Sequence, residues 1–163
     1  PSAEGEAALV SLVQDAMPHK KKMKIADLYA GCGTFTGPAL KNGTVHAVEE
    51  NGKAIQAITG ASKKVPNLTA EKRNLAAEPL TVRELKNYDV VIFDPPRAGA
   101  KEQCEKLAKS TVETVIAVSC NPATFARDAK ILIDGGYKFK KLTGVDQFIW
   151  SPHTEVVGVF SRV

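Results

Sequence analysis

The fold is decided by the stretch Ile25-Ala26-Asp27-Leu28-Tyr29-Ala30-Gly31-Cys32-Gly33-Thr34-Phe35. An apolar segment ends in an acid and runs into a glycine-rich turn, after which the residues from Thr34 onward are predicted to begin a helix. A strand, a glycine turn and a helix in this order open a βαβ unit. Because Gly31 and Gly33 have no Cβ, the backbone of the turn can lie directly against a ligand.

The spacing of the turn distinguishes between kinds of ligand. A dinucleotide fingerprint is G-x-G-x-x-G, and here the third glycine, Gly37, falls one residue late. The carboxylate of Asp27 would repel a phosphate, but it suits a ligand with a cationic amino-acid end. S-adenosylmethionine has such an end and carries no phosphate. We therefore expect Asp27, Gly31 and Gly33 to bind S-adenosylmethionine, with a tight βα turn that binds nothing as the alternative.

Length and composition are those of one globular domain. The chain has 163 residues, of which 44% are hydrophobic and 25% charged, enough for an α/β domain with a full core. No apolar run approaches the ~20 residues of a membrane span, and no signal peptide appears. The cysteines lie far apart without a C-x-x-C pair, which argues against a metal or redox site. We expect a cytoplasmic protein that binds neither a membrane nor a metal.

The charge permits a nucleic-acid partner without requiring one. The formal net charge is +4, and the only dense basic run is Lys20-Lys21-Lys22 with Lys24. A surface loop before a strand commonly carries such a run in contact with water, so we interpret it as solvated, with a phosphate contact as the alternative.

The hydrophobic pattern alternates between strands and helices along the chain. The predicted helices cover residues 3–17, 34–41, 51–64, 79–86, 100–110 and 122–133, and the predicted strands cover 24–30, 44–49, 68–74, 89–94, 114–119, 138–145 and 155–163. The last two strands follow each other closely and should be antiparallel. The prediction is a doubly wound, mostly parallel seven-stranded sheet with one antiparallel strand as an edge partner.

Polar residues end several predicted strands, and in such sheets ligands bind outside the carboxyl ends. These residues are Asp27, Glu49, Asn74, Asp94 and Cys120. Glu49 could accept hydrogen bonds from both hydroxyls of a ribose. Asn74 could hydrogen-bond the adenine edge of the cofactor or simply be a turn residue.

The segment Asp94-Pro95-Pro96-Arg97 follows the most apolar strand. Two prolines cannot continue a central strand, so they fix a rigid loop there. In amino-methylating enzymes a related acid/amide-Pro-Pro-aromatic loop holds a flipped base. Here Asp94 can accept a hydrogen bond from a base N–H, and Arg97 offers planar donors in place of a stacking ring. The alternative is a loop with a structural role only.

Cys120 and Glu155 are the candidates for chemistry. Cys120 stands at the end of a strand and just before a helix, where the helix dipole favours a thiolate, so we interpret it as a nucleophile. Cys32 and Cys104 are interpreted as structural. Glu155 lies five residues after Trp150, at the start of the last strand, and a carboxylate in a pocket beside an aromatic residue can act as a base. Taken alone, Glu155 would be a solvated edge acid.

Together these motifs resemble the RNA uracil-5-methyltransferases that modify tRNA and 23S ribosomal RNA. The matching segments are Asp27-Leu28-Tyr29-Ala30-Gly31-Cys32-Gly33-Thr34-Phe35, Asp94-Pro95-Pro96-Arg97-Ala98-Gly99, Ser119-Cys120-Asn121-Pro122-Ala123-Thr124-Phe125-Ala126-Arg127-Asp128, Asp146-Gln147-Phe148 and His153-Thr154-Glu155. The resemblance implies a Rossmann-like class I S-adenosylmethionine-dependent methyltransferase fold. It adds Tyr29, Phe35 and Asp94 to the cofactor-binding residues. Members usually carry an N-terminal RNA-binding domain, so residues 1–163 are expected to be the single catalytic domain of a longer chain.

The resemblance also implies a mechanism. The Cys120 thiolate attacks C6 of a uracil in RNA, C5 takes the methyl group, and Glu155 then removes the C5 proton. Asp94 and Arg97 would bind the uracil, which must leave its stack to reach the pocket. No metal is required, and a monomer without a protein partner is expected. Two departures from the family pattern, at residues 148–151 and in His153-Thr154-Glu155, concern the base pocket.

Alternatives from other classes stay open at this point. A cytosine-5 methyltransferase also uses a thiol but commonly places one in the proline loop, where this chain has Arg97. An adenine-N6 methyltransferase needs an aromatic residue at that position and no nucleophile. A catalytically silent RNA-binding scaffold would keep the fold without the reaction. Between the two RNA classes, general resemblance favours 23S ribosomal RNA slightly over tRNA.

Overall fold

A computed structural model describes residues 2–146 and 154–163. Its sheet contains β1 (Met23–Leu28), β2 (Gly43–Glu49), β3 (Leu68–Lys72), β4 (Val90–Phe93), β5 (Thr114–Ser119), β6 (Lys138–Asp146) and β7 (Thr154–Ser161). The helices in the described part are α1 (Ala3–Ala16), α2 (Thr36–Ala39), α3 (Gly52–Ser62), α4 (Val82–Leu85), α5 (Lys101–Ala108) and α6 (Pro122–Asp134). The predicted alternation of strands and helices is confirmed in order and type.

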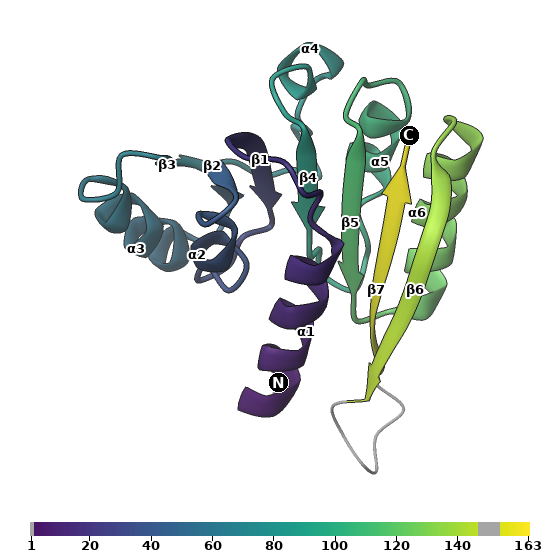
Figure 1. The fold of residues 1–163 in the computed structure, drawn as a ribbon, viewed down its shortest axis with the longest axis horizontal. Coiled ribbons are helices and arrows are strands. Elements are labelled where there is room, and N and C mark those ends of the chain that lie inside the picture. Colours follow the sequence, from purple (N-terminus) through teal and green to yellow (C-terminus); the bar gives the residue numbers. More distant parts are fainter. Residues whose placement is uncertain (1, 147–153) are drawn as a thin grey trace.

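The strand order is β3-β2-β1-β4-β5-β7-β6 in one seven-stranded sheet. Strands β1 to β5 pair in parallel, and β7 pairs antiparallel with both β5 and β6. The antiparallel strand was therefore predicted correctly, but its edge position was wrong, because β7 lies inside the sheet and β6 forms the edge (Figure 1). Burial explains the exchange: β7 carries buried Val157 and Phe160, whereas no residue of β6 is fully buried.

Helices cover both faces of the sheet. One core joins α1, α2 and α3 to one face through residues such as Val13, Ala39 and Ile58. The other core joins α4, α5 and α6 to the opposite face through Leu85, Leu107 and Leu132. In Figure 1, α1 crosses in front of the sheet while α5 and α6 lie behind it. This is the three-layer, doubly wound arrangement that the sequence predicts.

Several elements are shorter than predicted, most clearly around the glycine turn. β1 ends at Leu28 rather than at Ala30, because Tyr29 has φ +58°, which no strand residue adopts. α2 covers only Thr36–Ala39 instead of residues 34–41, and it contains a glycine and a proline, which are poor helix formers. The backbone from Tyr29 to Phe35 is therefore a turn over its whole length.

Side-chain caps begin four of the described helices, α1, α3, α4 and α6, at positions where the sequence offers them. Ser2 accepts a hydrogen bond from the Gly5 N–H at the start of α1, and Asn51 accepts from the first N–H groups of α3. Asn121 caps α6 in the same way, followed by Pro122 in its first turn. The cap at Asn121 fixes the point where the chain leaves Cys120 and enters α6.

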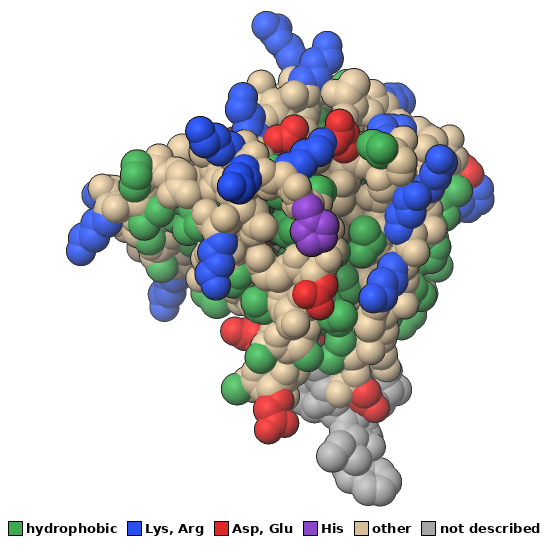
Figure 2. All heavy atoms as spheres, viewed as in Figure 1, with side chains coloured by type: hydrophobic (Ala, Val, Ile, Leu, Met, Phe, Trp, Pro, Cys, Tyr) green, Lys and Arg blue, Asp and Glu red, His purple; other side chains and the backbone are tan. Residues whose placement is uncertain are grey.

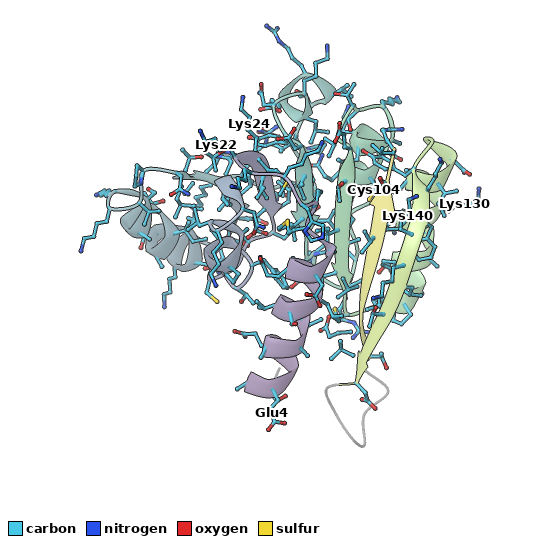
Figure 3. All side chains as sticks on the ribbon, in the orientation of Figure 1. Glu4, Lys22, Lys24, Cys104, Lys130 and Lys140 are labelled. Carbon is cyan, nitrogen blue, oxygen red and sulfur yellow. The ribbon has the colours of Figure 1, made fainter. Side chains whose placement is uncertain are left out.

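The basic run lies at the amino end of β1. In Figure 3, Lys22 and Lys24 are near the top of the molecule, whereas Glu4, at the start of α1, is at the bottom. Figure 2 shows lysine and arginine side chains gathered over the upper part of this face and along β6. Lys20 is paired with Glu113 at 2.7 Å. Within the described residues, no helix has the length and apolarity that crossing a membrane would need.

Candidate active site

A hollow of about 350 Å³ opens where the strand order reverses between β1 and β4. Leu28 of β1 lies beside Phe93 of β4, so Tyr29 and Asp94 emerge together at the carboxyl ends of these strands. Among the residues predicted to bind the cofactor, Tyr29, Glu49, Asn74 and Asp94 line this hollow. Such a switch point is where doubly wound sheets bind their ligands.

Glu49 ties the end of β2 to the glycine turn. Its Oε2 accepts a hydrogen bond from the Gly31 N–H at 2.7 Å, and its Oε1 accepts from the N–H groups of Glu50 and Asn51, each at 2.8 Å. A carboxylate has about four acceptor sites, so one remains for a ligand hydroxyl. Gly31 itself has φ +58°, in the left-handed region that glycine favours.

Asp27 lies beneath the turn and not at the surface of the hollow. Its side chain is fully buried, its Oδ2 accepts a hydrogen bond from the Thr36 hydroxyl at 2.5 Å, and its Oδ1 has no hydrogen-bond partner among the described residues. Burial raises the pKa of the Asp27 carboxyl to about 7, an effect that the Thr36 hydrogen bond opposes and that the charges of Asp94 and Glu49 increase. Direct contact of this carboxyl with a cofactor stays a prediction.

Two other residues of the turn also lie away from the main hollow. Phe35 is buried in the core between the sheet and α1 to α3. Gly33 lines a separate hollow of about 230 Å³, bounded by α2 and α3. Their predicted part in cofactor binding is therefore untested, and both also support the turn: Phe35 by packing and Gly33 through its φ of +93°.

Asn74 has the turn role that the sequence left as an alternative. Its Oδ1 accepts hydrogen bonds from the N–H groups of Ala76 and Ala77, and its Nδ2 donates to Glu50 at 2.9 Å. Contact with an adenine stays a prediction. The hollow is also lined by Arg73 and Pro96, which the sequence did not suggest as cofactor residues. Arg73 pairs with Glu84 at 2.9 Å, which holds its side chain along the edge of the hollow.

Cys120, Asp94 and Glu155 come together at the same edge of the sheet. Ser119 lies opposite Val156 in the antiparallel pairing of β5 and β7, so Cys120 and Glu155 follow at the adjacent positions. The charge of Glu155 acts on both Cys120 and Asp94. The predicted nucleophile, base and base-binding acid thus come from three strands and share one electrostatic environment.

The protonation of this group differs from the expectation for Cys120. A helix dipole was expected to favour the thiolate, but the pKa of the Cys120 thiol is raised, first by burial and then by the charges of Glu155 and Asp94, while Arg97 lowers it. Burial, followed by the charge of Glu155, raises the pKa of Asp94 to about 7. Burial also raises the pKa of Glu155. Burial and the charges of the two acids therefore oppose formation of the Cys120 thiolate.

The proline loop is attached to α6 by side chains that sequence reasoning missed. The Arg97 side chain is exposed, and its carbonyl oxygen accepts hydrogen bonds from Asn121 and Thr124, both at 3.0 Å. Asp128, which is 3% exposed, accepts from the Ala100 N–H at 2.7 Å. An aspartate on the side of α6 that faces the core was the signal in the sequence that could have revealed this attachment.

Other predicted groups fall outside these contacts. Cys104 is buried and Cys32 is exposed, so only the former is an interior residue. His153 and residues 148–151 lie outside the described residues. Within the part of the chain that the structure describes, no three His, Cys, Asp or Glu side chains are placed to hold a metal ion.

Comparisons of the sequence and the fold with known proteins agree with the resemblance to methyltransferases. A family model described as tRNA (Uracil-5-)-methyltransferase matches residues 1–163. The chain belongs to this family. The resemblance drawn from the sequence motifs is therefore confirmed.

Members of the family among the relatives are longer than this chain. An uncharacterized RNA methyltransferase of Agrobacterium fabrum is 47% identical over 171 residues, which cover 99% of this chain and 41% of that protein. The 23S rRNA (uracil(1939)-C(5))-methyltransferase RlmD of Alteromonas naphthalenivorans is 35% identical, over 99% of this chain and 35% of its own length. The chain thus spans well under half the length of these relatives.

Solved structures confirm the fold. The Pyrococcus abyssi tRNA (uracil-54, C5)-methyltransferase in complex with S-adenosyl-L-homocysteine superimposes with a TM-score of 0.79 at 30% identity, over 95% of this chain and 38% of that one. The M. jannaschii TYW2 structure in complex with AdoMet gives a TM-score of 0.68 at 18% identity and shows the shared fold alone. The predicted class I methyltransferase architecture is therefore correct.

Proposed function

We propose that this chain is the catalytic domain of an enzyme that transfers a methyl group from S-adenosylmethionine to C5 of a uridine in RNA. The observation that carries the proposal is the convergence of Cys120 and Glu155 on Asp94, which itself lines the hollow at the switch point. A nucleophile, a base and a hydrogen-bond acceptor are the groups that this reaction needs. Membership in the family supports the same assignment.

The cofactor of this domain is S-adenosylmethionine. Tyr29, Glu49 and Asp94 border the hollow and would hold it, with the free acceptor site of Glu49 toward a ribose hydroxyl. Burial raises the pKa of the Tyr29 phenol well above its usual range, so the phenol stays neutral and can pack against a cationic ligand. Gly31 leaves the turn open to the cofactor, since a Cβ there would meet nothing within 4 Å, while Asp27, Gly33, Phe35 and Asn74 support the surrounding turns.

The proposed reaction needs a nucleophile, a methyl donor and a base, which are Cys120, S-adenosylmethionine and Glu155. The Cys120 thiolate adds to C6 of the uracil, and the C5–C6 electron pair becomes an enolate. C5 then forms a bond to the methyl group as the methyl–sulfonium bond breaks, which leaves S-adenosylhomocysteine. Glu155 removes the proton from C5, the C5–C6 double bond re-forms, and the thiolate leaves. Asp94 and Arg97 would bind the edge of the flipped uracil.

The substrate class is RNA, and 23S ribosomal RNA is favoured over tRNA. The relative that is named for 23S rRNA is 35% identical to this chain over the aligned residues, and the tRNA enzyme of known structure is 30% identical. Profiling RNA from cells with and without the gene tests this choice. Loss of a 5-methyluridine from 23S rRNA supports it, and loss from tRNA alone contradicts it.

Methyl transfer from labelled S-adenosylmethionine by the complete protein tests the reaction. The expected product, after digestion of the RNA to nucleosides, is 5-methyluridine. Cys120→Ala should abolish its formation, whereas Cys32→Ser should retain it, because Cys32 is exposed and lines the separate hollow between α2 and α3. Full activity of Cys120→Ala would refute the covalent scheme, and a methylated cytidine or adenosine would refute the uridine assignment. No product from wild-type protein that binds both S-adenosylmethionine and RNA would favour the silent scaffold.

A further inference from the structure

The loop that carries Asp94 is held from outside by α6. The Arg97 carbonyl oxygen accepts hydrogen bonds from the Asn121 side-chain amide and the Thr124 hydroxyl, each at 3.0 Å. The next carbonyl oxygen, that of Ala98, accepts from Arg127 Nη2 at 2.9 Å. At its start the Asp94 N–H donates to the Leu28 carbonyl of β1 at 3.3 Å, and beyond Asp94 the loop has a single internal hydrogen bond among those described, from the Gly99 N–H to the Pro96 carbonyl at 2.8 Å. Its position therefore depends on side chains of another element.

Asp128 completes the attachment from the interior. Its Oδ2 accepts a hydrogen bond from the Ala100 N–H at 2.7 Å, where the loop enters α5. Its Oδ1 accepts from Nε and Nη2 of Arg127, at 3.0 and 2.9 Å. A carboxylate that is only 3% exposed would be costly without these partners. Arg127 is thereby fixed in the orientation that reaches the Ala98 carbonyl.

Gly99 shows how closely the loop and α6 fit. Its φ is +81°, and a Cβ at this position would lie 2.5 Å from Arg127 Nη2 and 2.7 Å from Asp128 Oδ2. A side chain would therefore have to displace the two groups that hold the loop. The loop approaches α6 to a distance that only glycine allows.

We propose that Thr124, Arg127 and Asp128 form a latch that fixes Asp94 relative to Cys120, and that they are positioning residues for the reaction. Cys120 stands just before α6 and Asp94 just before the latched loop, so hydrogen bonds between loop and helix set the separation of the two groups. The inference rests on the proposed function, since Asp94 and Cys120 would have to hold the same uracil. Misplacement by about 1 Å can cost about 10²-fold in rate.

A matched pair of arginine variants in the complete protein separates positioning from general stability. Arg127→Lys removes the planar fork that reaches Ala98 and Asp128. Arg162→Lys is the control, because Arg162 likewise donates to the carbonyls of Gly135, Leu107 and Ala108, at 2.9, 3.2 and 2.9 Å, but does so away from the reacting groups. Both variants should lower the melting temperature by similar amounts.

Only the latch variant should alter the chemistry. We expect Arg127→Lys to reduce single-turnover methyl transfer at least tenfold and Arg162→Lys to leave it within twofold of wild type. If both variants lose activity in proportion to their loss of stability, the latch is merely structural and the proposal is overturned. Thr124→Val, which keeps the shape and removes the hydroxyl, should show a smaller loss that Thr124→Ser restores. Equal activity of Thr124→Val and Thr124→Ser would also count against the latch.

A second readout does not depend on uridine methylation. The groups that act on the Cys120 thiol are Glu155, Asp94 and Arg97, and the two acids oppose its ionisation. Loosening the loop should let Asp94 move away, so the pH midpoint of Cys120 alkylation, measured by peptide mass spectrometry, should fall in Arg127→Lys and stay unchanged in Arg162→Lys. An unchanged midpoint in Arg127→Lys contradicts the latch. A wild-type enzyme that makes no 5-methyluridine contradicts the proposed function, while the alkylation result still decides the latch.

Discussion

At the scale of single residues, burial is the main cause of the raised pKa values of the acids near the glycine turn and the proline loop. One carboxylate oxygen of Asp27 accepts a hydrogen bond from Thr36, the other has no partner in the part of the chain that the structure describes, and the pKa of this carboxyl is raised to about 7. Asp94 is likewise raised to about 7. Both acids are therefore partly neutral near neutral pH, which limits the repulsion between them and Glu155.

The raised pKa of Asp27 predicts that stability depends on pH. Between about pH 4 and 7 the unfolded chain ionises Asp27 while the folded chain keeps it neutral, so the free energy of unfolding should fall as pH rises through this window. The slope from one such group is at most about 1.4 kcal/mol per pH unit. Asp27→Asn should flatten the profile in urea unfolding measured from pH 4.5 to 8. An unchanged slope would show that Asp27 is ionised in the folded protein.

Replacing Asp94 should change the ionisation of Cys120. The charge of Asp94 is one of the causes that raise the pKa of the thiol, so Asp94→Asn should lower that pKa and make alkylation of Cys120 faster at a given pH. Methyl transfer should nevertheless fall at least tenfold, because the acceptor for the base is weakened. Asp134→Asn is the control, since this exposed acid pairs with Lys130 at the far end of α6. Equal alkylation profiles for the two variants would contradict the account.

At the scale of elements, α6 connects the site to the sheet on two sides. Its N-terminal half holds the proline loop, and Phe125 packs against β7, the strand that carries Glu155. Gly158 of β7 makes this approach possible, because a Cβ there would lie 2.5 Å from Phe125 Cζ. The helix that follows Cys120 thus contacts both the loop that carries Asp94 and the strand that carries Glu155.

This packing predicts opposite effects for two glycine substitutions. Gly158→Ala should destabilise the protein by about 1–3 kcal/mol, because Phe125 must shift within a packed core. Gly60→Ala in α3 should stabilise it by about 0.5–1 kcal/mol, because a Cβ there meets nothing within 4 Å and alanine favours the helix. Urea unfolding measures both. Equal effects of the two substitutions would show that Phe125 does not constrain β7.

At the scale of the whole molecule, the sequence was sufficient for the order of elements but not for the position of β7. Alternating apolar segments and turn residues predict strands and helices locally, and the motif after β1 predicts the switch point. The edge position depends on whether β6 or β7 pairs with β5. The hydrophobic pattern of a single segment does not indicate which of the two does so. In the structure, Phe160 of β7 is buried and Leu142 of β6 is exposed, which explains why β6 is the edge strand. This difference becomes visible only when the positions of both strands are known.

For the candidate site, the sequence likewise predicted the positions of several residues but not their environment. Strand ends that carry Glu49, Asp94 and Cys120 could be recognised from composition and spacing, because parallel strands bring their carboxyl ends together. The burial of Asp27 and the raised pKa of Cys120 could not, since both result from groups contributed by other strands. The latch was missed because Thr124 and Arg127 reach backbone carbonyls, which have no signature in a sequence, and the one signal, Asp128 on the core-facing side of α6, was not used.

The central claim is that Cys120 bonds to uracil C6 and that Glu155 completes the reaction, and the most direct measurement is the mass of a trapped adduct. The complete protein with Glu155→Gln, incubated with S-adenosylmethionine and uridine-containing RNA, should accumulate a covalent complex. Digestion should give the Cys120 peptide carrying a methylated uridine. No such peptide should form from the double variant that combines Glu155→Gln with Cys120→Ala. A complex linked through another residue, or rapid release of 5-methyluridine by Glu155→Gln, would contradict the account.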